Sequence, residues 1–324
     1  MPVSPPSPLP AAPPASSLPE PARDRALVLG GGGSTGNAWM LGVLAGLQQA
    51  GVDAAGAELL VGTSAGATTA AQIAFRDPVE LHEATLGRGP RDAALRTGSA
   101  TAASEPDARR APRPVHAAVS EQLDRTARII AMSTDPSDMR RRMGAAALQL
   151  DGASDPARSA RWRAVVASRL PELRWPARDL RIVAVDASDG SPVVFERDSG
   201  VDLADAVAAS CASGAPHPVG GRRCIDGGYR RNENADLAIG SARVLVLSPF
   251  GGRSRHPQVW RMQLAAQTEE LRAAGSIVEI VRPVAEAARL IGANAMDPSL
   301  RPDAARAGFA QGAALADRLG AFWG

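Results

Sequence analysis

The chain has 324 residues, of which 45% are hydrophobic and 22% are charged, and this balance excludes a wholly disordered protein. The net charge is only +2, which argues against nucleic acid as a partner, although all 36 basic residues are arginines. No segment approaches the roughly 18 apolar residues of a membrane-spanning helix, and the N-terminus lacks the pattern of a secretory signal, so we expect a cytoplasmic protein.

The first 22 residues have an unusual composition, because they contain nine of the 26 prolines together with serine and alanine. Such a segment buries too little apolar surface to offset the conformational entropy lost on ordering. We therefore predict a disordered, proline-rich tail over residues 1–22, followed by one domain over residues 23–324.

A strand, a helix, a second strand and a second helix are predicted between residues 26 and 75. The apolar runs at 26–29 and 58–61 are short and bounded by glycine, as is typical of buried parallel strands. Apolar residues at helical spacing predict helices at 37–50 and 67–75. This order predicts a βαβ unit whose two strands are parallel neighbours.

Residues 76–160 predict a helical insertion, because they are rich in arginine, alanine and acidic residues and are interrupted by prolines. We expect a flexible stretch around residues 95–115 and a solvent-exposed helix face at Arg140, Arg141 and Arg142. A membrane-surface patch at these arginines is the less favoured interpretation, because acidic residues lie close to them in the sequence.

Strands and helices alternate again in the rest of the chain. Residues 180–185 and 192–195 flank a turn at Asp189 and Gly190, which predicts a β-hairpin. The other predicted elements are helices at 157–170 and 201–210, strands at 219–225 and 243–247, and helices at 264–290 and 302–322. Cys211 and Cys224 provide neither a disulfide framework nor a zinc site, and each is predicted to be a small buried side chain.

A glycine-rich loop, Gly31-Gly32-Gly33-Ser34-Thr35-Gly36, stands between the first strand and the first helix. A dinucleotide-binding loop is one interpretation, but it expects a carboxylate at the end of the next strand, which ends instead in Gly62-Thr63-Ser64. The other is a site where backbone N–H groups bind a developing oxyanion. A simple tight turn would need only one or two glycines.

The second motif, Gly62-Thr63-Ser64-Ala65-Gly66, has the form G-x-S-x-G between a predicted strand and a predicted helix. This is the context of a nucleophile elbow, in which a sharp turn exposes the serine hydroxyl. A helix N-terminus capped by serine is the alternative. Both motifs follow strands of one βαβ unit, so we expect them to lie at the same edge of the sheet.

The third motif, Asp226-Gly227-Gly228, ends a predicted strand and is typical, by itself, of ordinary turn chemistry. With the three motifs in this order, the chain resembles the patatin-like phospholipase family over roughly residues 25–323. The resemblance implies a three-layer α/β/α fold with a mostly parallel central sheet and a helical insertion. It also implies a serine hydrolase that cleaves carboxylic esters of lipids.

The resemblance assigns roles to the motif residues. Ser64 becomes the nucleophile, and Asp226 becomes the base of a Ser–Asp dyad that uses no histidine. The oxyanion hole is implied at Gly31, Gly32 and Gly33, and the other motif glycines are Gly36, Gly62, Gly66, Gly227 and Gly228. No metal or cofactor is implied. The expected partner is a phospholipid, a lysophospholipid or a related acyl ester, and a transient contact with a membrane surface is left open.

Two positions depart from the family pattern. Many members have a basic residue where this chain has Thr35, so one charge near the oxyanion is missing. Residues 213–221 lack the bulky apolar side chains expected before the Asp226 motif, which affects the lining of the acyl pocket rather than the chemistry.

Other functions stand beside this one as alternatives. An α/β-hydrolase with a Ser64–Asp226–His256 triad is one, because His256 is the histidine that follows the other two residues in the chain. A nucleotide-binding module that uses only the glycine-rich loop and a catalytically silent lipid-binding relative are two more. His217 flanks the Asp226 strand and is predicted in a surface loop.

Overall fold

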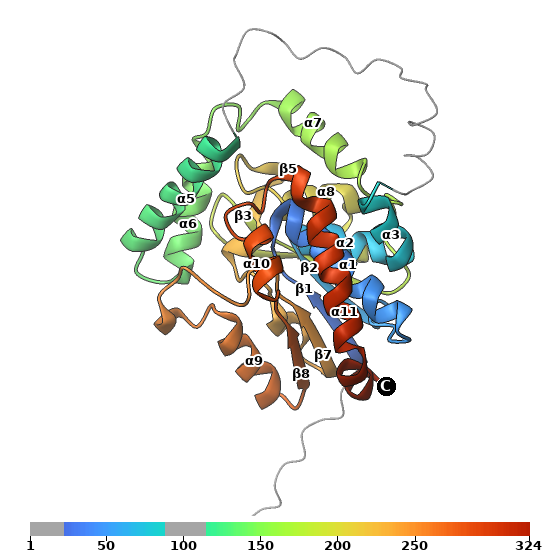
Figure 1. The fold of residues 1–324 in the computed structure, drawn as a ribbon. Helices are drawn as coiled ribbons and strands as arrows, with labels where there is room; N and C mark the ends of the chain where they lie inside the picture. Colours follow the sequence, from blue (N-terminus) through green and yellow to red (C-terminus); the bar gives the residue numbers. More distant parts are fainter. Residues whose placement is uncertain (1–22, 88–114) are drawn as a thin grey trace, which may run out of the picture.

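The computed structural model describes residues 23–87 and 115–324 (Figure 1). The tail predicted over residues 1–22 lies outside the described residues, and so does nearly all of the flexible stretch predicted around residues 95–115. The division of the chain into a tail and one domain therefore stays a prediction.

A mixed sheet forms the centre of the molecule (Figure 1). Its strands are, in spatial order, β5 (His217–Val219), β6 (Arg222–Asp226), β3 (Asp179–Asp186), β2 (Leu59–Thr63), β1 (Arg23–Leu29), β7 (Ser241–Leu247) and β8 (Ile277–Val281), while β4 (Pro192–Phe195) pairs with β3. The neighbouring strands β3, β2, β1, β7 and β8 run parallel to one another. The pairs β3–β4, β3–β6 and β5–β6 are antiparallel. β1 and β2 are parallel neighbours, which confirms the predicted pairing.

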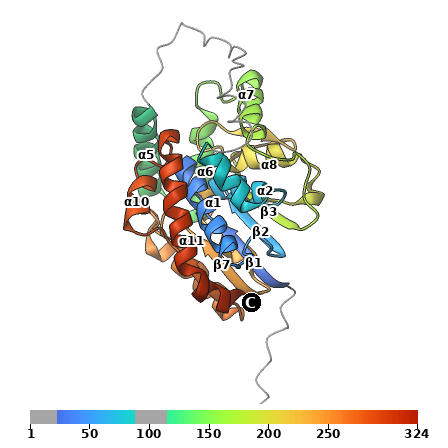
Figure 2. The same ribbon diagram turned by 45° about the vertical axis from the view of Figure 1, so that its right-hand side comes forward.

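Successive side chains of a strand point to opposite faces of the sheet, so the central strands contribute to a core on each face. On β1, Leu27 and Leu29 belong to one buried cluster, and Ala26 and Val28 belong to another. The first cluster includes helices α1 (Gly33–Gln49), α2 (Ala65–Ile73), α8 (Leu203–Ser210) and α11 (Arg301–Trp323), whereas the second includes α9 (Leu264–Ala273). Figures 1 and 2 show helices on both faces of the sheet, so the fold is a three-layer α/β/α sandwich.

Helices α1 and α11 pack in unusually close contact. A Cβ atom added to Gly42 of α1 would lie 2.1 Å from the Ala305 carbonyl oxygen, and one added to Gly308 of α11 would lie 2.3 Å from the Trp39 carbonyl oxygen. Glycine removes the side chains that would otherwise separate the two backbones. This contact brings the beginning of α11 to the beginning of α1, beside the glycine-rich loop.

The region between β2 and β3 is helical in its described part. It contains α3 (Pro78–Thr85), α5 (Val115–Met132), α6 (Pro136–Leu148) and α7 (Pro156–Ala167). Asp77, Asp135 and Asp155 cap α3, α6 and α7, and each aspartate precedes a proline at the first helical position. Helix α6 covers the end of β3, since a Cβ atom added to Gly144 would lie 2.3 Å from the Ala187 carbonyl oxygen.

Two predicted elements were wrong. The strand predicted at 219–225 is a hairpin, because Gly220 and Gly221 take positive φ angles of 56° and 76° and turn β5 back onto β6. The helix predicted at 264–290 is interrupted: α9 ends before Gly275 (φ 93°), β8 follows, and α10 (Ala285–Ile291) completes the region. The β8 sequence, Ile-Val-Glu-Ile-Val, continues an apolar pattern that a helix would also fit.

The exposed helix face predicted at the three arginines needs a correction at Arg140. Its Nε donates to the Gly190 carbonyl oxygen at 2.8 Å, and burial lowers its pKa. Arg141 and Arg142 are exposed and pair with Asp138 on the same helix. Arg140 is therefore a packing residue that holds α6 to the β3–β4 turn.

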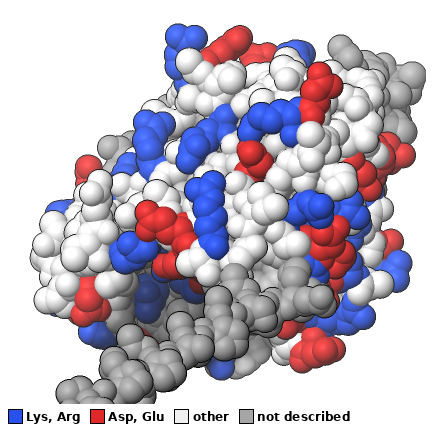
Figure 3. All heavy atoms as spheres, turned by 90° about the horizontal axis from the view of Figure 1, so that it is seen from below, with Lys and Arg blue, Asp and Glu red and all other residues white. Residues whose placement is uncertain are grey.

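The face seen from below carries acidic and basic side chains interspersed (Figure 3). This mixture agrees with the small net charge of +2. Across residues 23–87 and 115–324, no helix is long and apolar enough to cross a membrane.

Candidate functional site

Ser64 occupies a sharp turn between β2 and α2. Its φ and ψ angles are 54° and −116°, a conformation that costs a non-glycine residue about 1–3 kcal/mol. The C-terminal end of α8 holds this backbone in place: the Ser64 N–H donates to Ser210 Oγ at 2.9 Å, and Cys211 Sγ donates to the Ser64 carbonyl oxygen at 3.1 Å. A strained backbone that its neighbours fix on both sides presents the Ser64 hydroxyl in one orientation.

Glycine is required on both sides of Ser64. A Cβ atom added to Gly66 would lie 1.8 Å from the Leu29 carbonyl oxygen, and one added to Gly62 would lie 2.6 Å from Ala67 Cα. The start of α2 therefore lies directly against the end of β1. The spacing of the second motif reflects this close approach of backbones.

Asp226 ends β6 and lies beside Ser64. Its side chain is 8% exposed, and burial raises the pKa of its carboxyl to about 6. Two neighbours oppose this rise: the Gly228 N–H, which donates to Asp226 Oδ1 at 2.8 Å, and the nearby Ser64 side chain, which also lowers the pKa of Asp226. The structure thus brings together the two side chains that the sequence singled out, although 162 positions (226 − 64) separate them in the chain.

The glycine-rich loop borders Ser64. A Cβ atom added to Gly31 would lie 3.7 Å from Ser64 Cβ. The Gly31 N–H, however, donates to the Asn232 carbonyl oxygen at 3.0 Å, so it is already occupied. In the part of the chain that the structure describes, the N–H groups of Gly32, Gly33 and Ser34 have no acceptor. The resemblance predicted the oxyanion hole at Gly31, Gly32 and Gly33, whereas the free N–H groups of the loop are those of Gly32, Gly33 and Ser34.

A polar segment, Asn232-Glu233-Asn234, connects the three motifs and was not identified as a unit from the sequence. Asn232 binds both backbone groups of Gly31: its carbonyl accepts from the Gly31 N–H, and its Nδ2 donates to the Gly31 carbonyl at 3.3 Å. Asn234 Nδ2 donates to Thr63 Oγ1 at 3.0 Å and to the Gly227 carbonyl at 3.2 Å. This segment fixes the loop, the serine turn and the aspartate turn relative to one another.

We expect Asn234→Ala to lower the free energy of unfolding by about 2–3 kcal/mol, because buried polar groups lose partners and alanine is disfavoured in the left-handed region. Asn234 has φ 54°, so Asn234→Gly keeps the backbone and removes only the hydrogen bonds. Urea denaturation measures both variants. Glycine should cost less than alanine, and two variants as stable as the wild type would contradict the bridging role.

Glu233 is a buried carboxyl within the same segment. It is 1% exposed, and burial raises its pKa. Ser248 Oγ and Asn232 Nδ2 donate to Glu233 Oε1 at 2.7 and 3.0 Å. Glu233 therefore binds the segment to Ser248, the residue after β7, and not to Ser64.

Neither His217 nor His256 forms a hydrogen bond or an ion pair with Ser64 or Asp226 among the residues that the structure describes. His256 follows β7 and contacts Ser254 and Trp260, and burial lowers its pKa to about 4. His217 is buried in β5, and its Nε2 lies 2.9 Å from Asp205 Oδ1. The surface-loop position predicted for His217 was therefore wrong, because His217 begins β5, the strand that pairs with the Asp226 strand β6.

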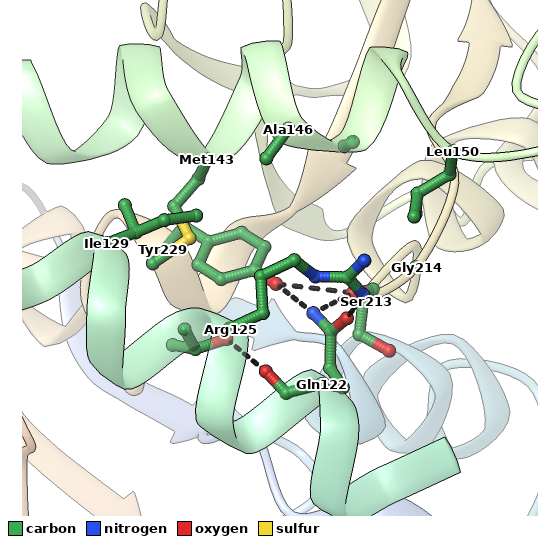
Figure 4. A pocket seen from close by; sticks show the side chains of 11 residues that line it. Gln122, Arg125, Ile129, Met143, Ala146, Leu150, Ser213, Gly214 and Tyr229 are labelled. Atoms are coloured by element: carbon green, nitrogen blue, oxygen red, sulfur yellow. Dashed lines mark hydrogen bonds between the residues drawn. The ribbon is translucent and has the colours of Figure 1, made fainter.

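Tyr229 connects the Asp226 motif to the helical region (Figure 4). Its hydroxyl donates to the Ser213 carbonyl at 3.2 Å and accepts from Gln122 Nε2 of α5 at 2.9 Å. The cleft beside it is lined by apolar side chains such as Ile129 and Met143 and by polar ones such as Gln122 and Arg125, and it has room for about one water molecule at most. In this conformation the cleft does not hold an acyl chain.

Both cysteines have thiols that stay protonated near neutral pH. Burial raises the pKa of Cys211 and of Cys224 to about 12. Within the described ranges, no three histidine, cysteine or carboxylate side chains gather in a way that could hold a metal ion. The chemistry of the site therefore has to be derived from Ser64, Asp226 and the free backbone N–H groups.

One family of known proteins matches most of this chain. A family model described as patatin-like phospholipase matches residues 27–239, which is more than half of the chain and includes all three motifs. A search of curated proteins found no match. Among solved structures, VipD from Legionella pneumophila is 14% identical, with a TM-score of 0.40, and the match covers 92% of this chain and 67% of that one. The type III effector protein ExoU is 17% identical, with a TM-score of 0.37; the match covers 92% of this chain and 54% of the ExoU chain, about half its length.

Proposed function

The chain belongs to the patatin-like phospholipase family, and on that premise we propose that it is a serine lipid acyl hydrolase with Ser64 as nucleophile and Asp226 as base. Membership of the family implies lipid acyl hydrolase activity. The assignment of the two residues rests on one observation: Ser64, held at a φ angle of 54°, is close enough to the buried Asp226 carboxyl to affect its pKa, which burial raises to about 6.

Acyl transfer begins when Asp226 accepts the Ser64 proton as Ser64 Oγ attacks the ester carbonyl. The bond to the leaving alcohol then breaks, the alcohol takes the proton from Asp226, and an acyl-enzyme forms on Ser64. Water attacks this ester with Asp226 again as base, which releases the carboxylic acid and restores the Ser64 hydroxyl. Every proton in the cycle passes through one carboxyl group.

The oxyanion is stabilised by backbone donors at two helix N-termini. Gly32 and Gly33 offer N–H groups without protein acceptors among the described residues, and Ala65, the residue after the nucleophile, begins α2. Each such donor contributes roughly 10²- to 10³-fold to the rate. We therefore assign the hole to Gly32, Gly33 and Ala65, and Gly31 instead fixes the loop to Asn232.

The elevated pKa of Asp226 suits its role as a base. An unperturbed aspartate, with a pKa of about 3.9, accepts a proton from an alcohol poorly. Burial favours the neutral carboxyl, so the ionised form is a stronger base than a solvated aspartate.

We expect activity to fall about tenfold per pH unit below pH 6, because protonation of Asp226 removes the base. The rate should be level above that value. Rates of ester hydrolysis between pH 4 and pH 9 test this, with stability measured at each pH to exclude unfolding. A rate that stays constant down to pH 4 would contradict the assignment of the base.

A Ser64–Asp226–His256 triad is the competing mechanism, and the contacts of His256 with Ser254 and Trp260 do not favour it. We expect His256→Ala to keep most of the activity, whereas loss of a triad histidine removes nearly all of it. Rates of short-chain ester hydrolysis by the wild type and by His256→Ala decide between the dyad and the triad. A loss of three or more powers of ten in a folded variant would favour the triad.

Burst kinetics test the proposed function directly. A chromogenic acyl ester should release one equivalent of alcohol per enzyme molecule before the steady state, because an acyl-enzyme accumulates when deacylation is slow. Titration with NAD or FAD tests the nucleotide-binding alternative. Saturable dinucleotide binding without any ester hydrolysis would overturn the proposal.

A further inference from the structure

Asn232 has one polar atom, its side-chain carbonyl oxygen, that the contacts of the glycine-rich loop do not use. Its Nδ2 donates to the Gly31 carbonyl oxygen at 3.3 Å and to Glu233 Oε1 at 3.0 Å. Because both neighbours are acceptors, they fix the amide nitrogen on their side and turn Oδ1 the other way. Within residues 23–87 and 115–324, no donor binds Asn232 Oδ1, and the residue is partly exposed. This oxygen is therefore free to accept a hydrogen bond from a molecule in the site.

Asn232 Oδ1 lies close to both Ser64 and Asp226. A Cβ atom added to Gly31 would lie 2.7 Å from Asn232 Oδ1 and 3.7 Å from Ser64 Cβ. A Cβ atom added to Gly228 would lie 3.8 Å from Asn232 Oδ1 and 3.1 Å from Asp226 Oδ1. In each case the two real atoms are no further apart than the sum of the two distances. This separation is on the scale of one water molecule with a hydrogen bond on either side, about 5–6 Å.

Deacylation uses a water molecule, and both of its hydrogens need a partner. One hydrogen passes to Asp226 as a proton while the water oxygen attacks the carbonyl carbon of the acyl-enzyme. The second hydrogen stays on that oxygen and becomes the hydroxyl hydrogen of the product acid. A polar hydrogen that leaves bulk water without finding an acceptor is costly. The site therefore needs an acceptor besides Asp226, close to the acyl carbonyl.

We propose that Asn232 Oδ1 accepts this second hydrogen and so orients the water that hydrolyses the acyl-enzyme, an inference that rests on the proposed acyl hydrolase function. The water oxygen bonds to the carbonyl carbon, the bond from that carbon to Ser64 Oγ breaks, and Asp226 returns the proton to Ser64 Oγ. Asn232 neither gains nor loses a proton. It is a catalytic residue of deacylation alone, because the attacking group in acylation is the Ser64 hydroxyl, whose one hydrogen passes to Asp226.

This role distinguishes water from an alcohol as the acceptor of the acyl group. Methanol has a single hydroxyl hydrogen, which passes to Asp226, and its methyl group needs no hydrogen bond. Loss of Asn232 Oδ1 should therefore slow acyl transfer to water more than acyl transfer to methanol. A change that only loosens the glycine-rich loop weakens the binding of the oxyanion, which both transfers require equally.

The test measures how the butyryl group of 4-nitrophenyl butyrate divides between water and methanol. The full-length protein is used at pH 8, above the pKa of about 6 to which burial raises Asp226. Release of nitrophenol gives the burst and steady-state rates, and gas chromatography measures butyric acid and methyl butyrate. For Asn232→Ala we expect a burst rate within about threefold of the wild type and a roughly tenfold higher ratio of methyl ester to acid, the effect of one lost hydrogen bond.

Two further variants separate the acceptor oxygen from the contacts that hold the loop. Asn232→Asp keeps an acceptor but loses both donor hydrogens, so it should acylate more slowly and keep the wild-type ratio of products. Asn234→Gly is the matched control, because it removes the hydrogen bonds of a second asparagine in the same segment. It should lower the burst and steady-state rates by the same factor and leave the ratio unchanged. Asn232→Ser, which is also too short to reach the water, replaces Asn232→Ala if the alanine variant does not fold.

The outcomes separate this inference from the proposed function. An unchanged ratio in Asn232→Ala, or an equally raised ratio in Asn232→Asp or Asn234→Gly, would overturn the role in deacylation, because Asn232 would then act on the loop alone. Such results come from an active wild type and so leave the hydrolase intact. A wild type that shows neither a burst nor hydrolysis would instead contradict the proposed function, and this inference with it.

Discussion

Replacement of Ser64 by alanine should abolish ester hydrolysis, with a loss of at least 10⁴-fold, because no other group in the proposed mechanism can form the acyl-enzyme. The backbone should survive the change, since Ser210 and Cys211 hold the Ser64 main chain and not its hydroxyl. Initial rates on a soluble acyl ester measure the loss, and thermal unfolding shows that the variant is folded.

Ser254→Ala is a matched control for this experiment, because Ser254 is an exposed serine whose hydroxyl contacts His256. It should keep wild-type activity. A folded Ser64→Ala protein that retained more than a few per cent of the activity would show that another residue is the nucleophile.

The replacement Asp226→Asn should lower activity by roughly 10²- to 10⁴-fold, the range typical of lost general acid–base catalysis. Asparagine has the same shape but cannot accept the Ser64 proton, and the backbone donors of the oxyanion hole remain. The residual rate should no longer fall below pH 6. Asp186→Asn, which changes another buried aspartate at the end of β3, is the control and should be active.

The same variant should be more stable than the wild type at high pH. Because burial raises the folded-state pKa of Asp226 to about 6, its neutral form is favoured in the folded protein, and ionisation destabilises the fold as pH rises from about 4 to above 6. Asparagine avoids this cost, so we expect a gain of about 1–3 kcal/mol at pH 8 and none at pH 4. Urea denaturation at both pH values measures the difference, and equal stability at pH 8 would contradict the raised pKa.

The nucleophile turn could be predicted from the sequence because the turn requires glycine at fixed positions. Gly62 and Gly66 are required by backbone contacts that a Cβ atom would close, and the strands beside them are short apolar runs. Asp226 was identified only in combination with the other motifs, because Asp-Gly alone is typical of any turn. Its distance from Ser64 in space follows from the order of the strands, which no local pattern encodes.

Other parts of the site left no comparable signal. The loss of Gly31 as a free donor depends on Asn232, and the hydrogen bond from Arg301 to the Ser34 carbonyl oxygen depends on the packing of α11 against α1. Both involve residues more than 200 positions apart. An asparagine or an arginine in a polar stretch usually indicates solvent exposure, so only the folded structure distinguishes these two from the surface residues around them.

The helical region shows the same division between local and long-range information. The Asp-Pro pairs that begin α3, α6 and α7 are strong local signals. Helices α3 and α6 lie within residues 76–160, and α7 matches the separate helix predicted at 157–170. β8 was missed because five residues, four of them apolar, fit a helix or a strand equally well, and the pairing of β8 with β7 makes it a strand.

Mapping of a covalent adduct tests the central proposal most directly. A fluorophosphonate probe should label the wild-type protein once, and mass spectrometry of the digested protein should locate the phosphonyl group on Ser64. Labelling should slow as pH falls through about 6 and should be much slower in Asp226→Asn, because the probe reports the reactivity of the activated hydroxyl. An adduct on a different residue, or labelling of Ser64 that is equally fast without the Asp226 carboxylate, would contradict the Ser64–Asp226 mechanism.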